Sequence, residues 1–279
     1  MKRYVIALSV AGSDPSGGAG IQADLKTFSA LGVYGAAAIT AVTVQNTMGV
    51  KYVHALPPQV VYDQIVAVME DLQPDAVKLG MVNDVATLEA IVEALTAFPP
   101  KCLVVDPIIL SSNGKMLMTP EALTLMKKRL FPITNLLTPN LPETATLVGS
   151  ALDALIDVKE AADKILSCGV GAVLVKGGHA NGDCKKDRLF YKTDDGVLLR
   201  EFSAPAVMSR NTHGTGCTLS SAITAYMACG KGLVAAVDEA KRYISKALAT
   251  GADLIVGKGT GPLNHFFEPR KAIIEDKEP

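Results

Sequence analysis

The chain has 279 residues, of which 49% are apolar and 20% are charged, and its formal net charge is −1. This length allows one large α/β domain or two small ones, and the apolar share favours a buried parallel sheet covered by helices. The near-neutral charge argues against binding to nucleic acid or to an anionic membrane, and no apolar run has the length of a membrane span.

The five cysteines are scattered through the chain, and none has the CxxC spacing of a zinc site. An odd number of separated cysteines favours reduced thiols in a cytoplasmic protein. The apolar run Val5–Ala11 is followed at once by Gly-Ser-Asp-Pro, so it predicts a first buried strand rather than a signal peptide.

Short apolar runs alternate with amphipathic stretches from end to end. Strands are expected, in chain order, at Tyr4–Val10, Ala36–Val44, Ala76–Leu79, Leu103–Val105, Leu136–Thr138 and Ala172–Val175. Helices are expected at Ile21–Leu31, Pro58–Leu72, Val85–Leu95, Glu121–Leu130, Glu143–Leu147, Asp157–Ser167, Thr215–Ala228 and Leu233–Thr250. This alternation predicts a mostly parallel sheet with helices on both faces.

One segment breaks the alternation of strands and helices. Arg188–Lys192 and Val197–Phe202 flank Asp194-Asp195-Gly196, which predicts a β-hairpin at the edge of the sheet. The chain shows no repeat and no low-complexity linker, so we expect a single domain over residues 1–267. The charged tail, residues 268–279, is expected to be loosely held.

A glycine-rich segment, residues 12–20, follows the first predicted strand directly and precedes a helix. Its glycine spacing fits neither G-x-G-x-x-G nor G-x-x-x-x-G-K-[ST], so a dinucleotide site or a P-loop is not expected. A substrate-binding loop fits better, because open α/β sheets bind ligands at the carboxyl ends of their strands. The segment Lys176-Gly177-Gly178-His179 lies at another such end, and it fits a ligand loop and a plain turn equally well.

The segment Gly214-Thr215-Gly216-Cys217 opens an apolar helix. Backbone N–H groups at such a helix start bind anions, and the helix dipole reinforces them. This arrangement suits a transferring phosphoryl group. The same field is expected to lower the pKa of the Cys217 thiol from about 8.5, so that it could accept a proton from a substrate hydroxyl. A buried structural cysteine is the alternative interpretation.

Acidic residues follow two predicted strands. Asp106 comes directly after Leu103–Val105, and Glu143 follows the next strand along the chain. Two carboxylates at one edge of a sheet can hold Mg²⁺, chiefly through water. Asp24, one turn into the first helix, could reach a polar substrate edge. Each of them alone could equally be a solvated or a helix-capping carboxylate.

Taken in order, these segments resemble one known family. The chain is similar to the ribokinase-like superfamily and, within it, to the hydroxymethylpyrimidine/phosphomethylpyrimidine kinases of thiamine biosynthesis. The segments that carry the resemblance, over nearly the whole chain, are AGSDPSGGAGIQADLK (residues 11–26), TAVTVQNT (40–47), KLGM (78–81), VDP (105–107), TPN (138–140), KGGH (176–179) and THGTGC (212–217).

The resemblance implies a three-layer αβα fold and a homodimer. It also implies two successive phosphoryl transfers from ATP with Mg²⁺. The first acceptor would be the hydroxymethyl group of 4-amino-5-hydroxymethyl-2-methylpyrimidine, and the second would be the resulting monophosphate.

The resemblance also implies roles for individual residues. Gln45 would bind the aminopyrimidine edge, in a pocket lined by Gly12, Ala19, Asp24, Met81 and the apolar side chains of Val42 and Val44. Gly214, Thr215, Gly216 and Cys217 would form the anion hole, with Cys217 as the base. Asp106 and Glu143 would serve Mg²⁺, and the nucleotide phosphates would face Asn140, Lys176, Thr212 and His213.

Two other functions fit the same segments. Most sugar kinases of this superfamily carry Asp where Cys217 stands, and some pyridoxal kinases share the cysteine. A pyridoxal kinase is therefore the second hypothesis, because pyridoxal also presents a hydroxymethyl group on a flat nitrogen ring. A ligand-binding regulatory protein without catalysis is the third, although the presence of Asp106, Glu143 and Cys217 argues against it.

Overall fold

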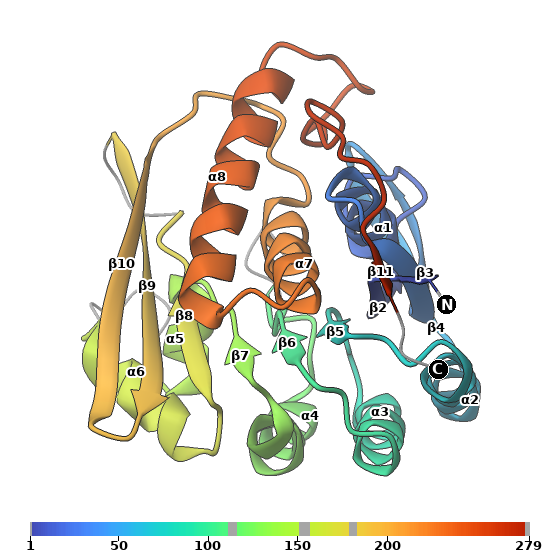
Figure 1. The fold of residues 1–279 in the computed structure, drawn as a ribbon, viewed down its shortest axis with the longest axis vertical. Coiled ribbons are helices and arrows are strands. Elements are labelled where there is room, and N and C mark those ends of the chain that lie inside the picture. Colours follow the sequence, from blue (N-terminus) through green and yellow to red (C-terminus); the bar gives the residue numbers. More distant parts are fainter. Residues whose placement is uncertain (1, 111–115, 151–156, 179–182, 277–279) are drawn as a thin grey trace.

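A computed structural model describes residues 2–110, 116–150, 157–178 and 183–276. Its main sheet has nine strands in the order β10-β9-β8-β7-β6-β5-β2-β3-β4 (Figure 1). The strands are β2 (Ile6–Ser13), β3 (Tyr34–Asn46), β4 (Gly49–Ala55), β5 (Ala76–Leu79), β6 (Leu103–Val105), β7 (Leu136–Leu137), β8 (Ala172–Val175), β9 (Cys184–Thr193) and β10 (Gly196–Pro205). Neighbours from β3 to β8 are parallel, and β4, β9 and β10 pair antiparallel.

Helices cover both faces of this sheet, as predicted (Figure 1). One face carries α1 (Gly20–Ala30), α7 (Thr215–Ala228) and α8 (Leu233–Gly251). The other carries α2 (Pro58–Asp71), α3 (Val85–Ala97), α4 (Pro120–Leu125), α5 (Leu141–Leu147) and α6 (Val158–Ser167). Strand β5 shows why two cores form, because Ala76 packs with the first helices while Val77 and Leu79 pack with the second. The predicted three-layer αβα fold is confirmed.

Local sequence signals account for several of the helix starts. The side chain of Asp84 accepts a hydrogen bond from the Thr87 N–H at the start of α3, and Asp157 caps α6 in the same way. Proline lies in the first turn of α2, α4 and α5, where its missing N–H costs nothing. The helix predicted at Glu121–Leu130 is instead the short α4, followed by a π-helical turn at Met126–Leu130 and a 3-10 turn at Phe131–Ile133.

The sequence did not predict strand β4, and the hairpin that it predicted is shorter than the hairpin β9–β10 of the structure. Most of β4 is exposed, so its sequence lacks the buried alternation that marks a strand. The hairpin β9–β10 lies at the sheet edge as predicted, and its pairing runs from Cys184–Pro205 to the turn at Thr193–Gly196.

The charged tail contributes a strand that the sequence did not predict. Strand β11 (Ile274–Asp276) pairs antiparallel with β1 (Lys2–Tyr4) in a separate two-stranded sheet. The Arg270 N–H also donates to the Ala30 carbonyl, and the Ile273 N–H donates to Gly32. Residues 270–276 are thus held against α1 and its following turn. Among the described residues, no helix is long and apolar enough to cross a membrane.

Candidate active site

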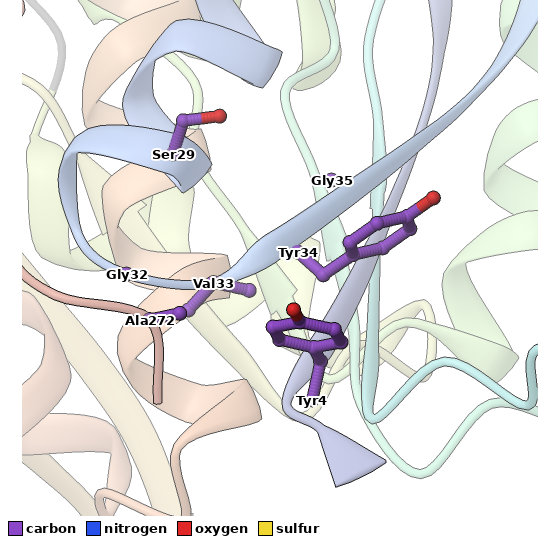
Figure 2. Close-up of a pocket in the computed structure, with 7 residues that line it drawn as sticks. All are labelled: Tyr4, Ser29, Gly32, Val33, Tyr34, Gly35 and Ala272. Carbon is purple, nitrogen blue, oxygen red and sulfur yellow. The ribbon is translucent and has the colours of Figure 1, made fainter. Parts of the chain in front are cut away.

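The residues that carry chemistry gather at the carboxyl edge of the sheet, in the loops after β2, β5, β6, β7 and β8 and at the start of α7. A pocket of about 360 Å³ lies at the opposite, amino-terminal edge. There the rings of Tyr4 and Tyr34 lie beside each other, with centroids 5.6 Å apart (Figure 2). Apart from these two tyrosines, the lining of this pocket holds no titratable side chain. The candidate site is therefore the cluster of side chains at the carboxyl edge, and not this pocket.

The start of α7 is shaped to receive an anion. Its N-cap Gly214 has a left-handed backbone with φ of 82°, and a Cβ there would overlap the Gly18 carbonyl oxygen. No described side chain caps the helix, so the N–H groups of Gly216 and Cys217 remain available to a ligand. Thr215 instead folds back, because its N–H and its Oγ1 both donate to the Thr212 carbonyl.

Lys176 and Asp106 stand beside this helix start. The Lys176 Nζ donates to Asp106 Oδ1 at 2.7 Å, and Thr138 Oγ1 donates to the same oxygen at 3.1 Å. A Cβ built on Gly216 would lie 3.4 Å from both Asp106 Oδ2 and Lys176 Nζ. Burial by itself raises the pKa of Asp106, but the charges of Lys176 and Lys78 and the hydrogen bonds from Lys176 and Thr138 together outweigh it, so the carboxyl pKa lies below its usual value. The structure thus brings a cation, a carboxylate and free N–H groups together.

Glu143 faces the same lysine from α5. It forms a capping box with Asn140, in which each side chain accepts from the other residue's N–H at 2.8 Å. Burial raises the pKa of Glu143; the charge of Lys176 opposes this shift, and that of Asp106 adds to it. Two neighbouring carboxylates that repel each other favour a divalent cation, which would relieve their repulsion. The described residues hold no cluster of three or more His, Cys, Asp or Glu side chains, so other oxygens would complete such an ion's shell.

The glycine-rich loop is organised by Asp14, which was not assigned a role from the sequence. Its carboxylate accepts from the N–H groups of Ser16, Gly18 and Ala19. Its Oδ2 also lies 2.8 Å from His213 Nε2. Burial raises the pKa of Asp14, but hydrogen bonds from His213 and Ser16 outweigh it and hold the pKa well below the usual range. Asp14 therefore ties the loop to the anion-binding segment.

The expected substrate residues are only partly brought together. Gln45 lies at this junction, with its Nε2 3.1 Å from His213 Nε2 and its Oε1 accepting from Thr43. Gly12 and Met81 are also in contact range, since a Cβ on Gly12 would lie 2.8 Å from Met81 Cε. Val44 differs: it pairs with Tyr52, is 52% exposed, and by strand alternation points away from Thr43 and Gln45.

Asp24 does not line a pocket. Its side chain is fully buried, and its carboxylate accepts from Lys78 at 2.7 Å, from Ser9 at 2.5 Å and from Ser221 at 2.6 Å. The expectation that Asp24 contacts the substrate is therefore corrected, because the pair that it forms with Lys78 lies beneath the site.

The expected activation of Cys217 is also corrected. Its thiol is buried, and burial raises its pKa to about 11. The charge of Lys78 and the Gly20 N–H oppose this shift, while Asp24 and Asp106 add to it. Helix position alone predicted a lowered pKa, but burial is the largest effect on this thiol and raises its pKa. His179 was also singled out in the sequence, and it lies outside the described residues.

Residues 14–264 match the family model described as phosphomethylpyrimidine kinase. The chain belongs to this family. It is 43% identical to the hydroxymethylpyrimidine/phosphomethylpyrimidine kinase of Escherichia coli over 95% of this chain and 98% of that one. It is also 45% identical to the thiamine biosynthesis bifunctional protein ThiED of Geobacter sulfurreducens. That match covers 93% of this kinase and 52% of the relative, so this kinase spans about half the length of ThiED.

Solved structures resemble this kinase as well. A phosphomethylpyrimidine kinase from Clostridium difficile is 43% identical, with a TM-score of 0.76 over 88% of this kinase and 99% of that chain. A pyridoxal kinase from Staphylococcus aureus, solved with AMP-PCP and pyridoxal, is 32% identical, with a TM-score of 0.83 over 98% of this kinase and 99% of that chain. The fold does not separate the two groups. Sequence identity does, and it favours the pyrimidine kinases.

For two residues of the kinase site, Asp14 and Lys78, the sequence contains a pattern that could have predicted their structural role. Asp14 begins an Asp-Pro-Ser-Gly turn, in which an aspartate commonly accepts from backbone N–H groups two residues on. Lys78 lies inside a four-residue strand that is buried throughout, and a charge in such a strand requires a partner.

Proposed function

We propose that this kinase transfers the γ-phosphoryl group of ATP to 4-amino-5-hydroxymethyl-2-methylpyrimidine and then to the resulting monophosphate, in thiamine biosynthesis. The observation that carries the proposal is the convergence of Lys176 and Asp106 on the uncapped start of α7, which Asp14 and His213 link to Gln45. An anion site with a lysine beside it, close to an amide that can pair with an aminopyrimidine edge, supports this proposal. The names of the relatives supply the substrate.

The chemistry divides among these residues. The N–H groups of Gly216 and Cys217 and the charge of Lys176 would stabilise negative charge on the transferring phosphoryl group. Gln45 would orient the ring, so that the hydroxymethyl oxygen faces that group. Pairing with this half-buried amide also selects against rings without the matching edge, because the amide would then lose a hydrogen-bond partner.

Mg²⁺ belongs to the proposal, and the residues present fit it. Among the described residues, Asp106 Oδ2 makes only a 3.4 Å contact with Ser220, and the charge of Asp106 raises the pKa of Glu143. These two carboxylates would hold the ion together with phosphate oxygens. A bound Mg²⁺ supplies charge neutralisation at the phosphates. ATP as donor is supported by the pyridoxal kinase relative solved with AMP-PCP.

A homodimer in the cytoplasm completes the proposal. The β3–β4 hairpin exposes Val44, Val50 and Tyr52, each more than half exposed, which offers apolar surface to a second copy. All five cysteines are free thiols, which suits a reducing compartment. Sedimentation equilibrium of the full chain tests the dimer, and a monomer at micromolar concentration would contradict it.

Phosphorylation of three acceptors measured side by side tests the function. The hydroxymethylpyrimidine, its monophosphate and pyridoxal are each supplied with ATP and Mg²⁺, and ADP release is followed. We expect the highest kcat/KM with the pyrimidine and clear turnover of its monophosphate. Equal or higher kcat/KM with pyridoxal would reassign the protein to vitamin B6 chemistry. Binding of the pyrimidine without ATP turnover would indicate a regulatory protein.

A further inference from the structure

Lys78 is a fully buried cation that the mechanism above does not use. All four residues of β5 are buried, and the side chain of Lys78 has no solvent exposure. A charge in such a place is costly unless it is paired and hydrogen-bonded. Its Nζ donates to Asp24 Oδ2 at 2.7 Å. Burial by itself lowers the pKa of Lys78, but the negative charges around it, that of Asp24 first, and the hydrogen bond to Asp24 together outweigh burial and raise the pKa, so the lysine stays protonated.

The partner carboxylate is held from several elements. Besides Lys78, Asp24 Oδ2 accepts from Ser9 on β2, and Asp24 Oδ1 accepts from Ser221 on α7. The pair therefore joins α1, β2, β5 and α7, and no described side-chain polar atom in the interior is left without a partner. Such a saturated network fixes the position of its charges.

This pair lies one helical turn below Cys217. Ser221, which contacts Asp24, is four residues after Cys217 on α7, and residues so spaced share one face of a helix. The charged groups that face the thiol are Lys78 in β5, Asp24 in α1, Asp106 directly after β6 and Lys176 directly after β8. Among the effects that favour a thiolate, the charge of Lys78 is the largest, followed by the Gly20 N–H.

We propose that Lys78, held in place by Asp24, is a positioning residue whose fixed charge stabilises the Cys217 thiolate that accepts the hydroxymethyl proton. The inference rests on the proposed function. In the step, the substrate O–H bond breaks and its proton goes to Sγ. The oxygen bonds to the γ-phosphorus, and the bond from phosphorus to ADP breaks with its electron pair leaving on ADP. The thiol then returns the proton to water.

The two transfers place different demands on this thiolate. The hydroxymethyl group of the first acceptor must lose a proton. The phosphate monoester of the second acceptor is already ionised at pH 8, because its second pKa is about 6. Lys78 is therefore needed for transfer to the alcohol and not for transfer to the monophosphate. A lysine that only holds the fold together would affect both transfers alike.

The test is the ratio of kcat on the pyrimidine alcohol to kcat on the monophosphate at pH 8. The double variant Asp24→Asn/Lys78→Met removes both charges, so that no unpaired buried charge remains. We expect kcat on the alcohol to fall by about a hundredfold, with kcat on the monophosphate and both KM values unchanged. Lys78→Arg, which keeps the charge, should retain the ratio of the original enzyme. In a Cys217→Ser background the double change should cost nothing further on the alcohol.

The matched control is Asp187→Asn/Lys241→Met, which removes a second lysine–carboxylate pair, 2.6 Å apart, on the same side of the sheet. We expect this control to leave the ratio unaltered. If the neutral Asp24–Lys78 variant does not fold, Lys78→Gln is measured instead, since its amide can still donate to Asp24. Equal losses on both acceptors, or no loss on the alcohol, would overturn the role of Lys78. Absence of turnover by the unaltered enzyme on either pyrimidine would instead overturn the proposed function.

Discussion

Two lysine–carboxylate pairs flank the start of α7, and they differ in access rather than in geometry. Nζ lies 2.7 Å from a carboxylate oxygen in both. The side chains of Lys78 and Asp24 have no solvent exposure, whereas those of Lys176 and Asp106 are 14% and 2% exposed. Asp24 has both oxygens occupied by close hydrogen bonds, while Asp106 Oδ2 has, within the described part of the chain, only the long contact with Ser220. The sealed pair, Lys78 with Asp24, keeps its two charges fixed in place. The open pair, Lys176 with Asp106, can exchange partners with an incoming ligand.

The largest expected effect tests the open pair. Lys176→Met removes the cation beside the α7 N-terminus, so the phosphoryl group common to both transfers loses a stabilising partner. We expect kcat to fall by about a thousandfold on the alcohol and on the monophosphate alike, measured by steady-state kinetics. Lys164→Met, at an exposed position on α6, is the control and should be neutral. A fall in kcat on only one of the two acceptors would contradict the assignment of the Lys176–Asp106 pair to the phosphoryl group that both transfers share.

The thiol between the two pairs should give the next largest effect. Cys217→Ser is expected to lower kcat on the alcohol by about a hundredfold while KM stays constant. Because burial raises the pKa of Cys217 to about 11, the thiol is mostly protonated at pH 7. The alcohol reaction should therefore accelerate as pH rises from 7 to 9. That rise should disappear in Cys217→Ser, and a variant that retains it would show that another group takes the proton.

A contact outside both pairs should change binding rather than turnover. Gln45→Ala removes the amide beside His213 that we expect to pair with the aminopyrimidine edge. KM for the pyrimidine should rise about tenfold with kcat nearly constant. Gln59→Ala, on the exposed face of α2, is the matched control. An unaltered KM would remove Gln45 from the substrate pocket.

The smallest expected effect concerns the stability of the loop above the pairs. Asp14 has a lowered pKa, so its carboxylate stabilises the fold at neutral pH, and this contribution is lost as pH falls below about 4. Asp14→Asn should lower the free energy of unfolding by about 1 to 2 kcal/mol at pH 7. In urea titrations, the difference from the unaltered protein should shrink at pH 3. A difference that stays constant with pH, or that also appears in the exposed control Asp163→Asn, would contradict this assignment.

The three layers were predictable from the sequence because strand–helix alternation is a local pattern. Strand β4 was not, since Gly49–Ala55 is held by pairing with β3 and buries little apolar surface. Lys176 and Asp106 were predictable as a cluster because both follow parallel strands, whose ends share one edge. The pKa of Cys217 was not, because burial by residues distant in the chain decides it. The burial of Asp24 depends equally on Lys78, 54 residues away.

The pairing of β1 with β11 has a consequence for how this domain can be joined to others. Lys2 lies opposite Asp276 in that small sheet, so the two ends of the described fold emerge side by side (Figure 1). They do so near the amino end of β2, whereas α7 begins at the carboxyl edge. A neighbour fused at either end would extend away from the catalytic side. The bifunctional Geobacter relative matches this kinase over 52% of its own length, and a fusion joined at these ends would leave the carboxyl edge of the sheet free of the join.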